Sequence, residues 1–365
     1  VRTRVDGGCI RYKNIPHHYG RTIVSRIKIM ADLDIAERRK PQDGKIRFRN
    51  YGGQNIEIRV AAIPTVGGHE TIAMRILADS EPIPLDRLGF SKQNYDRFKT
   101  AVSNPYGLIL VCGPTGSGKT TTLHSGLGFI NRPETKIWTA EDPVEITQRG
   151  LSQVQVNPRI GFDFAAAMRA FLRADPDVIM VGEMRDRETM QMGIEASLTG
   201  HLVLSTLHTN NAPESIARLL NLGMDPFNFA DAMLCVLAQR LVVTLCPQCR
   251  RPYHPSRSEY DELVREYGAP AAAPTGLPDY SERLTLYRPN GCKACSQTGY
   301  KGRMGLHELL VKTPAIKALI ENRASIEAVR SQAQKDGMTT LKQDGIQKIF
   351  SGQCDLRQVR KVCIV

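Results

Sequence analysis

The stretch LILVCGPTGSGKT at residues 108–120 joins a run of apolar side chains to a glycine-rich turn. The run predicts a buried strand, and the residues after the turn predict the start of a helix. Glycines let the backbone curl so that successive N–H groups point at one anion, and the helix adds its positive dipole end. In such a loop Lys119 supplies a mobile cation and the Thr120 hydroxyl can hold Mg²⁺. The predicted phosphate loop consists of Gly113, Pro114, Thr115, Gly116, Ser117, Gly118, Lys119, Thr120 and Thr121.

Further apolar runs follow this loop and alternate with helical patterns. They cover residues 136–140, 178–181 and 202–206. Strands that alternate with helices build a parallel sheet with helices on its faces. We therefore expect an α/β fold, followed by a mostly helical tail over residues 313–365.

The sequence before the phosphate loop predicts a smaller, separate structure. Apolar residues recur at helical spacing over residues 22–36, and three runs that alternate apolar and polar residues come next. These runs cover residues 45–49, 56–62 and 71–77. The pattern predicts a helix and an antiparallel meander. Arg59 and Arg75 fall on the strand face opposite the apolar side chains, where solvent exposure is the simplest explanation.

A linker is expected between these two parts. Glu81-Pro82-Ile83-Pro84 contains two prolines in four residues, which resist both a helix and a central strand. Ser91 follows and is expected to cap the next helix, because serine is a favoured N-cap residue.

Charge is distributed unevenly along the 365 residues. The chain has 49 basic and 37 acidic side chains, a net charge of +12, and residues 1–100 hold 19 basic and 11 acidic ones. Such an excess of positive charge favours binding to nucleic acid, to an anionic membrane surface or to a nucleotide polyphosphate. No apolar run approaches the roughly 18 residues of a membrane span, and a secretory signal is missing, so a cytoplasmic protein is expected. The chain starts without Met, which suggests a missing N-terminal part.

Four of the nine cysteines form two CxxC pairs, Cys246 with Cys249 and Cys292 with Cys295. A two-residue gap lets both sulfurs of a pair reach one ion, and four thiolates suit a structural zinc without an open position. The 42 residues between the pairs exceed the usual zinc-ribbon spacing, which leaves open one shared site or two knuckles. The other five cysteines are expected to act as small apolar residues.

Acidic residues follow two of the predicted strands. Glu183 comes just after the run Val178–Val181, and Glu141 closes the run that contains Trp138. A carboxylate at the carboxyl end of a strand lies where open α/β sheets bind their ligands. Glu183 is therefore the first candidate for holding Mg²⁺ or the attacking water, and Glu141 is the second.

Two histidines flank the predicted strand at residues 202–206. His201 precedes it, and His208 leaves from the end nearer the phosphate loop. A lone histidine is usually structural, but the position of His208 beside Thr206 favours contact with a terminal phosphate.

The chain resembles the secretion and pilus-assembly ATPases, whose zinc-bearing branch contains the type II secretion and type IV pilus extension motors. The resemblance covers nearly the whole chain and rests on several motifs together. These are GPTGSGKT, the aspartate-box segment TAEDPVE, the degenerate Walker B run DPDVIMVGEMRD, the histidine-box segment TGHLVLSTLHT, the cysteine pairs with TGYKGR at 298–303, and SRIKIMADLDIAERRKPQDGKI at 25–46.

The resemblance implies a PAS-like N-terminal domain joined flexibly to a RecA-like ATPase domain, assembled as a cytoplasmic homohexamer that uses ATP, Mg²⁺ and Zn²⁺. It implies that Lys119 and Thr120 bind phosphate and Mg²⁺, that Glu183 is the Walker B acid and that Glu141 belongs to the aspartate box. It makes His201 and His208 the histidine-box pair. The resemblance also implies that Arg59 and Arg75 reach the γ-phosphate. This interpretation replaces solvent exposure as the explanation for their position on the strands. The expected parts are residues 1–80 (N-terminal), 81–90 (linker), 91–244 (ATPase core), 245–312 (tetracysteine segment) and 313–365 (helical).

The implied activity is ATP hydrolysis that powers pilin extraction through an inner-membrane platform protein, with peripheral membrane association through that complex. The segment Ala170–Arg173 favours the pilus branch over the alternative, type II secretion. A nucleic-acid translocase is a remote alternative, because no aromatic stacking platform is evident, and a non-hydrolysing zinc adaptor is a third. Two departures limit the resemblance. The family usually has a basic residue before the first cysteine pair, where this chain has Val242–Thr244. The chain also begins after the further N-terminal domains that the extension motors normally carry.

Overall fold

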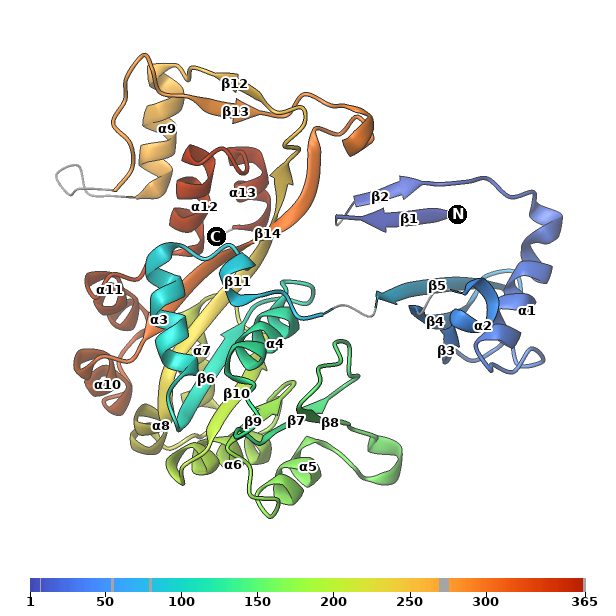
Figure 1. Ribbon diagram of the computed structural model, residues 1–365, viewed down its shortest axis with the longest axis horizontal. Coiled ribbons are helices and arrows are strands. Elements are labelled where there is room, and N and C mark those ends of the chain that lie inside the picture. The colour runs from blue at the N-terminus through green and yellow to red at the C-terminus, as the bar shows by residue number, and fades with distance from the viewer. Residues whose placement is uncertain (7, 54–55, 79–80, 269–275, 364–365) are drawn as a thin grey trace. The chain divides into compact units, whose positions relative to one another are not determined.

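The computed structural model describes residues 1–6, 8–53, 56–78, 81–268 and 276–363, which divide into two compact units (Figure 1). The first unit is Val1–Glu81 with Glu145–Thr147, and the second is Pro82–Val144 with Gln148–Val365. No helix among the described residues is long and apolar enough to cross a lipid bilayer.

The first unit contains a helix and a three-stranded antiparallel sheet in the order β3-β4-β5. This arrangement confirms the predicted helix and meander. Val60 and Ile46 form its small core with Ala31, and the α1 side chains Ile27 and Met30 pack on it. Its elements are β1 (Arg2–Val5), β2 (Gly8–Arg11), η1 (His17–Tyr19), α1 (Gly20–Met30), β3 (Gln42–Arg47), α2 (Arg49–Gly52), β4 (Ile56–Thr65) and β5 (His69–Ala78).

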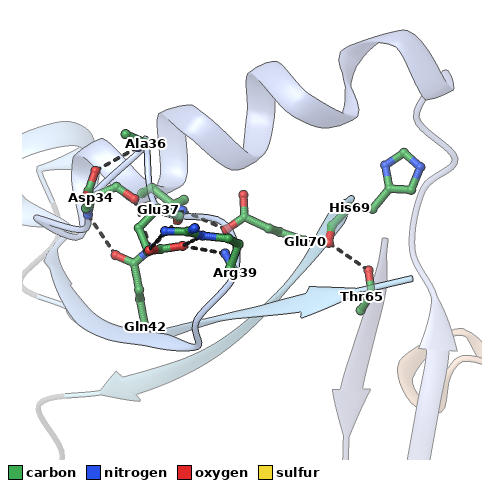
Figure 2. A network of polar contacts seen from close by, with 9 residues as sticks. Asp34, Ala36, Glu37, Arg39, Gln42, Thr65, His69 and Glu70 are labelled. Carbon is green, nitrogen blue, oxygen red and sulfur yellow. Dashed lines mark hydrogen bonds and ion pairs between the residues drawn. The ribbon is translucent and has the colours of Figure 1, made fainter. Parts of the chain in front are cut away.

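A hydrogen-bonded loop follows α1, so the helix expected over 22–36 ends early, at Met30. Figure 2 shows Gln42 beside Asp34 and Arg39 beside Glu37. The Asp34 carboxylate accepts from Ala36 N at 2.8 Å, and Gln42 Nε2 donates to Glu37 O at 2.8 Å. Such local side-chain bonds compete with helical ones and stop the helix.

A buried ion pair anchors this loop to the sheet. Lys28 Nζ donates to Glu37 O and to Glu70 Oε1, each at 2.7 Å, and both charged side chains are almost fully buried. Because a buried charge requires a partner, this pair ties α1, the loop and β5 together.

The second unit is built on a seven-stranded sheet in its described part, with the order β14-β11-β6-β10-β9-β7-β8. The four predicted strands pair in parallel as expected, but the sheet as a whole is mixed, because the additional strand β14 runs antiparallel to β11. The strands are β6 (Gly107–Cys112), β7 (Ile137–Glu141), β8 (Leu151–Gln155), β9 (Val178–Val181), β10 (Leu202–Leu207), β11 (Met233–Leu245) and β14 (Tyr300–Val311).

Both faces of this sheet are buried. Leu108 and Leu110 of β6 belong to the apolar cluster of one face, and Ile109 and Val111 belong to the cluster of the other. Strands covered on both faces are expected to be continuously apolar, as β6 is. Ser91 caps α3 by accepting a hydrogen bond from Asn94 N, as predicted. The helices before the cysteine pairs are η2 (Leu85–Arg87), α3 (Lys92–Val102), α4 (Lys119–Ile130), η3 (Pro158–Ile160), α5 (Phe164–Phe171), α6 (Arg187–Leu198), α7 (Ala212–Asn221) and α8 (Pro226–Ala232).

The cysteine pairs lie in an excursion between β11 and β14, two neighbouring strands of the sheet. The excursion contains β12 (Arg251–Tyr253), α9 (Arg257–Tyr267), β13 (Leu286–Arg288) and η4 (Lys293–Cys295). Of the loop tip expected over 268–278, residues 269–275 lie outside the described residues. The predicted helical tail is confirmed by α10 (Pro314–Glu321), α11 (Ile326–Lys335), α12 (Leu341–Phe350) and α13 (Leu356–Val362).

Candidate active site and metal centre

The predicted phosphate loop connects β6 to α4, in the strand, turn and helix order that the sequence predicted. Gly118 at its end has φ of 89°, a left-handed conformation that favours glycine. A Cβ at this position would also lie 2.8 Å from Gln239 Nε2. The backbone conformation therefore favours a glycine here, and a Cβ would displace the Gln239 amide that contacts the loop.

Lys119 folds onto its own loop. Its Nζ donates to Gly113 O at 2.8 Å and to Pro114 O at 3.2 Å. Burial lowers the pKa of this lysine, and the Glu183 carboxylate acts in the opposite direction. Among the described residues, the nearby Ser117 Oγ is buried without a hydrogen-bond partner. An unpartnered hydroxyl next to a buried cation fits a loop that holds an anionic group.

Gln239 of β11 contacts the phosphate loop, and no sequence motif predicts this contact. Its Nε2 donates to Ser117 O at 2.9 Å, and its Oε1 accepts from Thr122 Oγ1 at 2.6 Å. The neighbouring Arg240 donates to Asn210 O and Oδ1, each at 3.1 Å. No local pattern marks Gln239, because its partners lie more than 100 residues away in the sequence.

Glu183 and His208 meet at the carboxyl ends of two neighbouring parallel strands, β9 and β10. Glu183 Oε1 lies 3.1 Å from His208 Nε2, and Glu183 Oε2 lies 2.7 Å from Arg185 NH2. Thr206 Oγ1 donates to Gly182 O at 2.6 Å and so holds the backbone before Glu183. The predicted carboxylate and histidine therefore share one edge of the sheet.

Opposing effects set the protonation of Glu183. Partial burial raises the pKa of this carboxyl group, but the hydrogen bond and charge of Arg185 and the charges of His208 and Lys119 lower it more. The net result is a pKa below the usual value, so Glu183 is ionised at neutral pH. An ionised carboxylate that remains partly open to water can accept a proton or join a Mg²⁺ coordination shell.

Glu141 also ends a strand, but its surroundings differ. Its carboxylate is buried and accepts from His124 Nε2 at 3.0 Å, Thr139 Oγ1 at 2.8 Å and Gln153 Nε2 at 3.0 Å. Its backbone adjoins the other acid, since Gly182 N donates to Ala140 O at 2.8 Å. No sequence motif marks His124 or Gln153 as part of the site.

His201 lies at the opposite end of β10 from His208. Its ring is oriented by Nδ1, which lies 2.9 Å from Ala196 O at the end of α6. The register pairs Leu202 with Gly107 at the start of β6 and Leu207 with Cys112 at its end. Within one chain, the structure therefore does not bring His201 to the phosphate loop.

Arg59 and Arg75 lie side by side on the sheet of the first unit. They are direct cross-strand partners, and Lys45 of β3 pairs directly with Arg59 on its other side. Lys45 Nζ lies 2.7 Å from Glu57 Oε1, and Arg75 NH1 lies 3.6 Å from Glu145 Oε1. The register thus forms a row of three cations in place of the two arginines singled out from the sequence.

The four cysteines of the two CxxC pairs converge on one point. Their Sγ atoms all lie within 4.8 Å of one another. The separations are 3.9 Å for Cys246–Cys292, 3.8 Å for Cys249–Cys295 and 3.7 Å for Cys292–Cys295. Zn–S bonds of about 2.3 Å in a tetrahedron place sulfur atoms about 3.8 Å apart. The donor set and its spacing therefore fit one shared metal site rather than two knuckles.

Backbone donors favour the thiolate form in this cluster. Burial raises the pKa of Cys295, but the N–H groups of Cys292 and Gly299 donate to its Sγ and bring the pKa down to about 6. Burial and the neighbouring thiols raise the pKa of Cys249 to about 11, although Gly291 N donates to its Sγ. The backbone donors therefore stabilise the Cys295 thiolate and orient it for a metal.

Comparison with known proteins supports the resemblance drawn from the motifs. Residues 1–361 match the family model described as type II/IV secretion system protein. The type IV pilus assembly ATPase PilB of Myxococcus xanthus is 44% identical over 361 residues, which are 98% of this chain and 62% of that protein. The type II secretion system ATPase E of Vibrio cholerae is 42% identical over 366 residues, 99% of this chain and 69% of that protein. The chain thus spans less than two thirds of the Myxococcus relative.

Solved structures show a similar fold. The pilus retraction motor PilT, crystallised with bound ADP, matches with a TM-score of 0.68 and 25% identity and covers 100% of this chain and 90% of its own. The ATPase DotB of Legionella pneumophila matches with a TM-score of 0.70 and 22% identity over 99% of this chain and 90% of its own. The second of these supports the fold alone.

Proposed function

Because the chain belongs to the type II/IV secretion system protein family, we propose that it binds ATP with Mg²⁺ and hydrolyses it. One observation carries this proposal. The phosphate loop with its buried Lys119 and the Glu183–His208 pair both lie at carboxyl ends of adjacent parallel strands, β6, β10 and β9. Open α/β sheets bind nucleotides at this edge.

The residues divide into three roles. Lys119 and the loop N–H groups hold the phosphates, and the Thr120 hydroxyl is a ligand for Mg²⁺, which neutralises phosphate charge when bound. Glu183 orients and deprotonates the attacking water, and His208 fixes the carboxylate at its Oε1. Glu141 and His201 stay in the proposed site as the aspartate-box and histidine-box residues, with no direct contact to phosphate assigned from this chain.

Arg59 and Arg75 are proposed to reach the γ-phosphate from the first unit, which we interpret as a PAS-like domain. Their placement supports this role, because like charges directly opposite each other destabilise a sheet and are not favoured by folding. Arginine that neutralises charge on the transferred phosphoryl group can be worth several orders of magnitude in rate.

The assembled form that we propose is a homohexameric motor at the cytoplasmic face of the inner membrane. It acts on a platform protein to extract pilin and extend a type IV pilus, without nucleic acid. Pseudopilus assembly in type II secretion is the alternative, since relatives of both kinds are similarly identical to the chain. The proposed parts keep the boundaries 1–80, 81–90, 91–244, 245–312 and 313–365.

Phosphate release from Mg·ATP by the purified chain tests the enzymatic proposal. Lys119→Ala should abolish turnover because it removes the cation from the loop, whereas Lys92→Ala, an exposed lysine on α3, should leave it unchanged. Arg75→Ala should bind nucleotide normally and lose turnover. Equal rates for Lys119→Ala and the unaltered chain would refute hydrolysis at this loop.

The cysteine cluster is proposed to hold a structural zinc through Cys246, Cys249, Cys292 and Cys295. Four thiolates leave no open coordination position, so the metal stabilises the excursion between β11 and β14 without entering catalysis. Metal analysis should find one zinc per chain in protein purified without chelator. Removal of the metal should first expose the excursion to protease, and a content well below half an equivalent would contradict the proposal.

A further inference from the structure

A sealed network of polar side chains lies behind the phosphate loop. It joins His124 of α4 to Glu141 at the end of β7 and to Gln148, with Thr139 and Gln153 as further members. The His124 side chain is fully buried, and 3% of the Glu141 side chain is exposed. The proposed hydrolysis mechanism assigns no role to His124, Gln148 or Gln153.

The hydrogen bonds determine the state of the His124 ring. Gln148 Nε2 lies 2.9 Å from His124 O, a carbonyl that can only accept, so the amide nitrogen of Gln148 faces this residue. The same nitrogen lies 2.7 Å from His124 Nδ1, which must therefore accept as well. The ring is then neutral, carries its proton on Nε2 and donates to Glu141 Oε2 at 3.0 Å.

The other side of Glu141 is held in the same way. Gln148 N donates to Gln153 Oε1 at 2.7 Å, which turns Gln153 Nε2 toward Glu141 Oε1 at 3.0 Å. Thr139 Oγ1 donates to the same oxygen at 2.8 Å. Because a carboxylate can only accept, each of these groups must donate to Glu141, and together they hold the carboxylate in a single orientation.

The network reaches both ends of one acidic segment. Glu141 directly precedes Asp142–Thr147 and Gln148 directly follows it, and His124 contacts both of these residues. His124 lies four residues after Thr120, on the same face of α4. His124 therefore connects the helix that carries the phosphate loop with the two residues that flank the segment.

We propose that His124 is a positioning residue that holds Glu141 and Gln148, the two residues that flank the acidic segment Asp142–Thr147, at a set place relative to the phosphate loop. The role is a deeper account of the ATP hydrolysis proposed above and rests on it. Because α4 begins at the phosphate loop, His124 links a triphosphate held there to both ends of the segment. Without the ring, the segment loses its two attachments to α4.

Three substitutions at one position test this role. His124→Leu removes both hydrogen bonds and should lower kcat by about 10- to 100-fold, as loss of positioning does, with the affinity for a fluorescent ADP analogue unchanged. His124→Gln restores a donor toward Glu141, and His124→Asn restores an acceptor toward Gln148. Each should recover part of the lost rate. Ser125→Ala is the matched control, because it removes a part-buried hydrogen bond on α4, from Ser125 Oγ to Thr121 O, outside the network.

Amide hydrogen exchange over Asp142–Thr147 supplies a second readout. Addition of a non-hydrolysable ATP analogue with Mg²⁺ should slow exchange in the unaltered chain and in Ser125→Ala, and should have no effect in His124→Leu. A shared pathway also predicts that His124→Leu with Gln148→Leu is no slower in turnover than His124→Leu alone.

The outcomes separate this inference from the proposed function. Normal kcat in His124→Leu, or equal nucleotide-dependent exchange in that variant and the unaltered chain, would overturn the positioning role. Loss of kcat without rescue by His124→Gln or His124→Asn, together with lost ADP binding, would also overturn it and point to misfolding. A chain that does not hydrolyse ATP at all would refute the proposed function, and exchange would then decide the inference by itself.

Discussion

Two glutamate–histidine pairs of almost equal length occur in the second unit, in opposite surroundings. Glu183 and His208 lie 3.1 Å apart, with 16% and 43% of their side chains exposed. Glu141 and His124 lie 3.0 Å apart, with 3% and 0% exposed. Both carboxylates lie at the ends of strands of the same sheet, and by sequence alone they are alternative candidates for one catalytic task.

The difference between the pairs lies in the partners. Glu183 is surrounded by the cations Arg185 and Lys119 and keeps access to water. Glu141 is surrounded by the donors of Thr139, Gln153 and His124, which leave its orientation no freedom. A carboxylate must exchange partners to act on water, so accessibility and neighbouring charge, rather than the distance to histidine, separate a reactive acid from a structural one.

The largest expected effect breaks the open pair. Glu183→Gln should lower kcat by about 10²- to 10⁴-fold, because it removes the carboxylate charge that is proposed to accept the proton from water. Nucleotide affinity should be kept, and steady-state phosphate release together with equilibrium binding measures both. If Glu183→Gln turns over normally while Glu141→Gln does not, the two assignments must be exchanged.

A smaller effect, on stability, is expected from the sealed pair. Glu141→Gln brings an amide N–H₂ group against one of two donors, His124 Nε2 or Gln153 Nε2, and the buried donor left without an acceptor should cost about 1–3 kcal/mol of folding stability. Trp138, the single tryptophan of the chain, lies three residues away and reports unfolding of this unit by fluorescence in urea. Unfolding curves that overlap with those of the unaltered chain would show that Glu141 is not held as described.

The smallest effect concerns pH. The Arg185 hydrogen bond and charge lower the pKa of Glu183, so Arg185→Ala should raise that pKa toward or above its usual value. Because the ionised form is the base, the acid limb of the kcat/KM profile should move to higher pH, with the rate at neutral pH nearly unchanged. Arg173→Ala provides a control on another exposed arginine. An unmoved acid limb would mean that Glu183 is not the group that titrates.

The features predicted correctly are those written in a few consecutive residues. The glycine spacing of the phosphate loop, the apolar runs of β6, β9 and β10, the alternation in the first unit and the helical tail each leave a local pattern. The end of the first helix was predicted wrongly, because side chains compete there with the helix for backbone hydrogen bonds. The helix expected to reach residue 36 ends at Met30, because Asp34 and Gln42 offer the backbone alternative bonds.

Other features carry no local signal. Gln239 reaches the phosphate loop from β11, and β14 adds an antiparallel strand after an excursion of more than 50 residues. The sequence is compatible with one shared metal site or with two. The structure favours one site, because the excursion brings the two CxxC pairs together. Contacts between residues so far apart in the chain leave no periodicity, so motif analysis cannot find them.

The sequence by itself determined that this chain carries a phosphate loop, acids at neighbouring strand ends and two thiol pairs, because each depends on residue types at fixed short spacing. Only the tertiary structure decided which acid is open and which is sealed, and that His124 rather than His201 belongs to the surroundings of the phosphate loop. The physical reason is that burial and hydrogen-bond partners are properties of neighbours in space, and these neighbours come from different strands and helices.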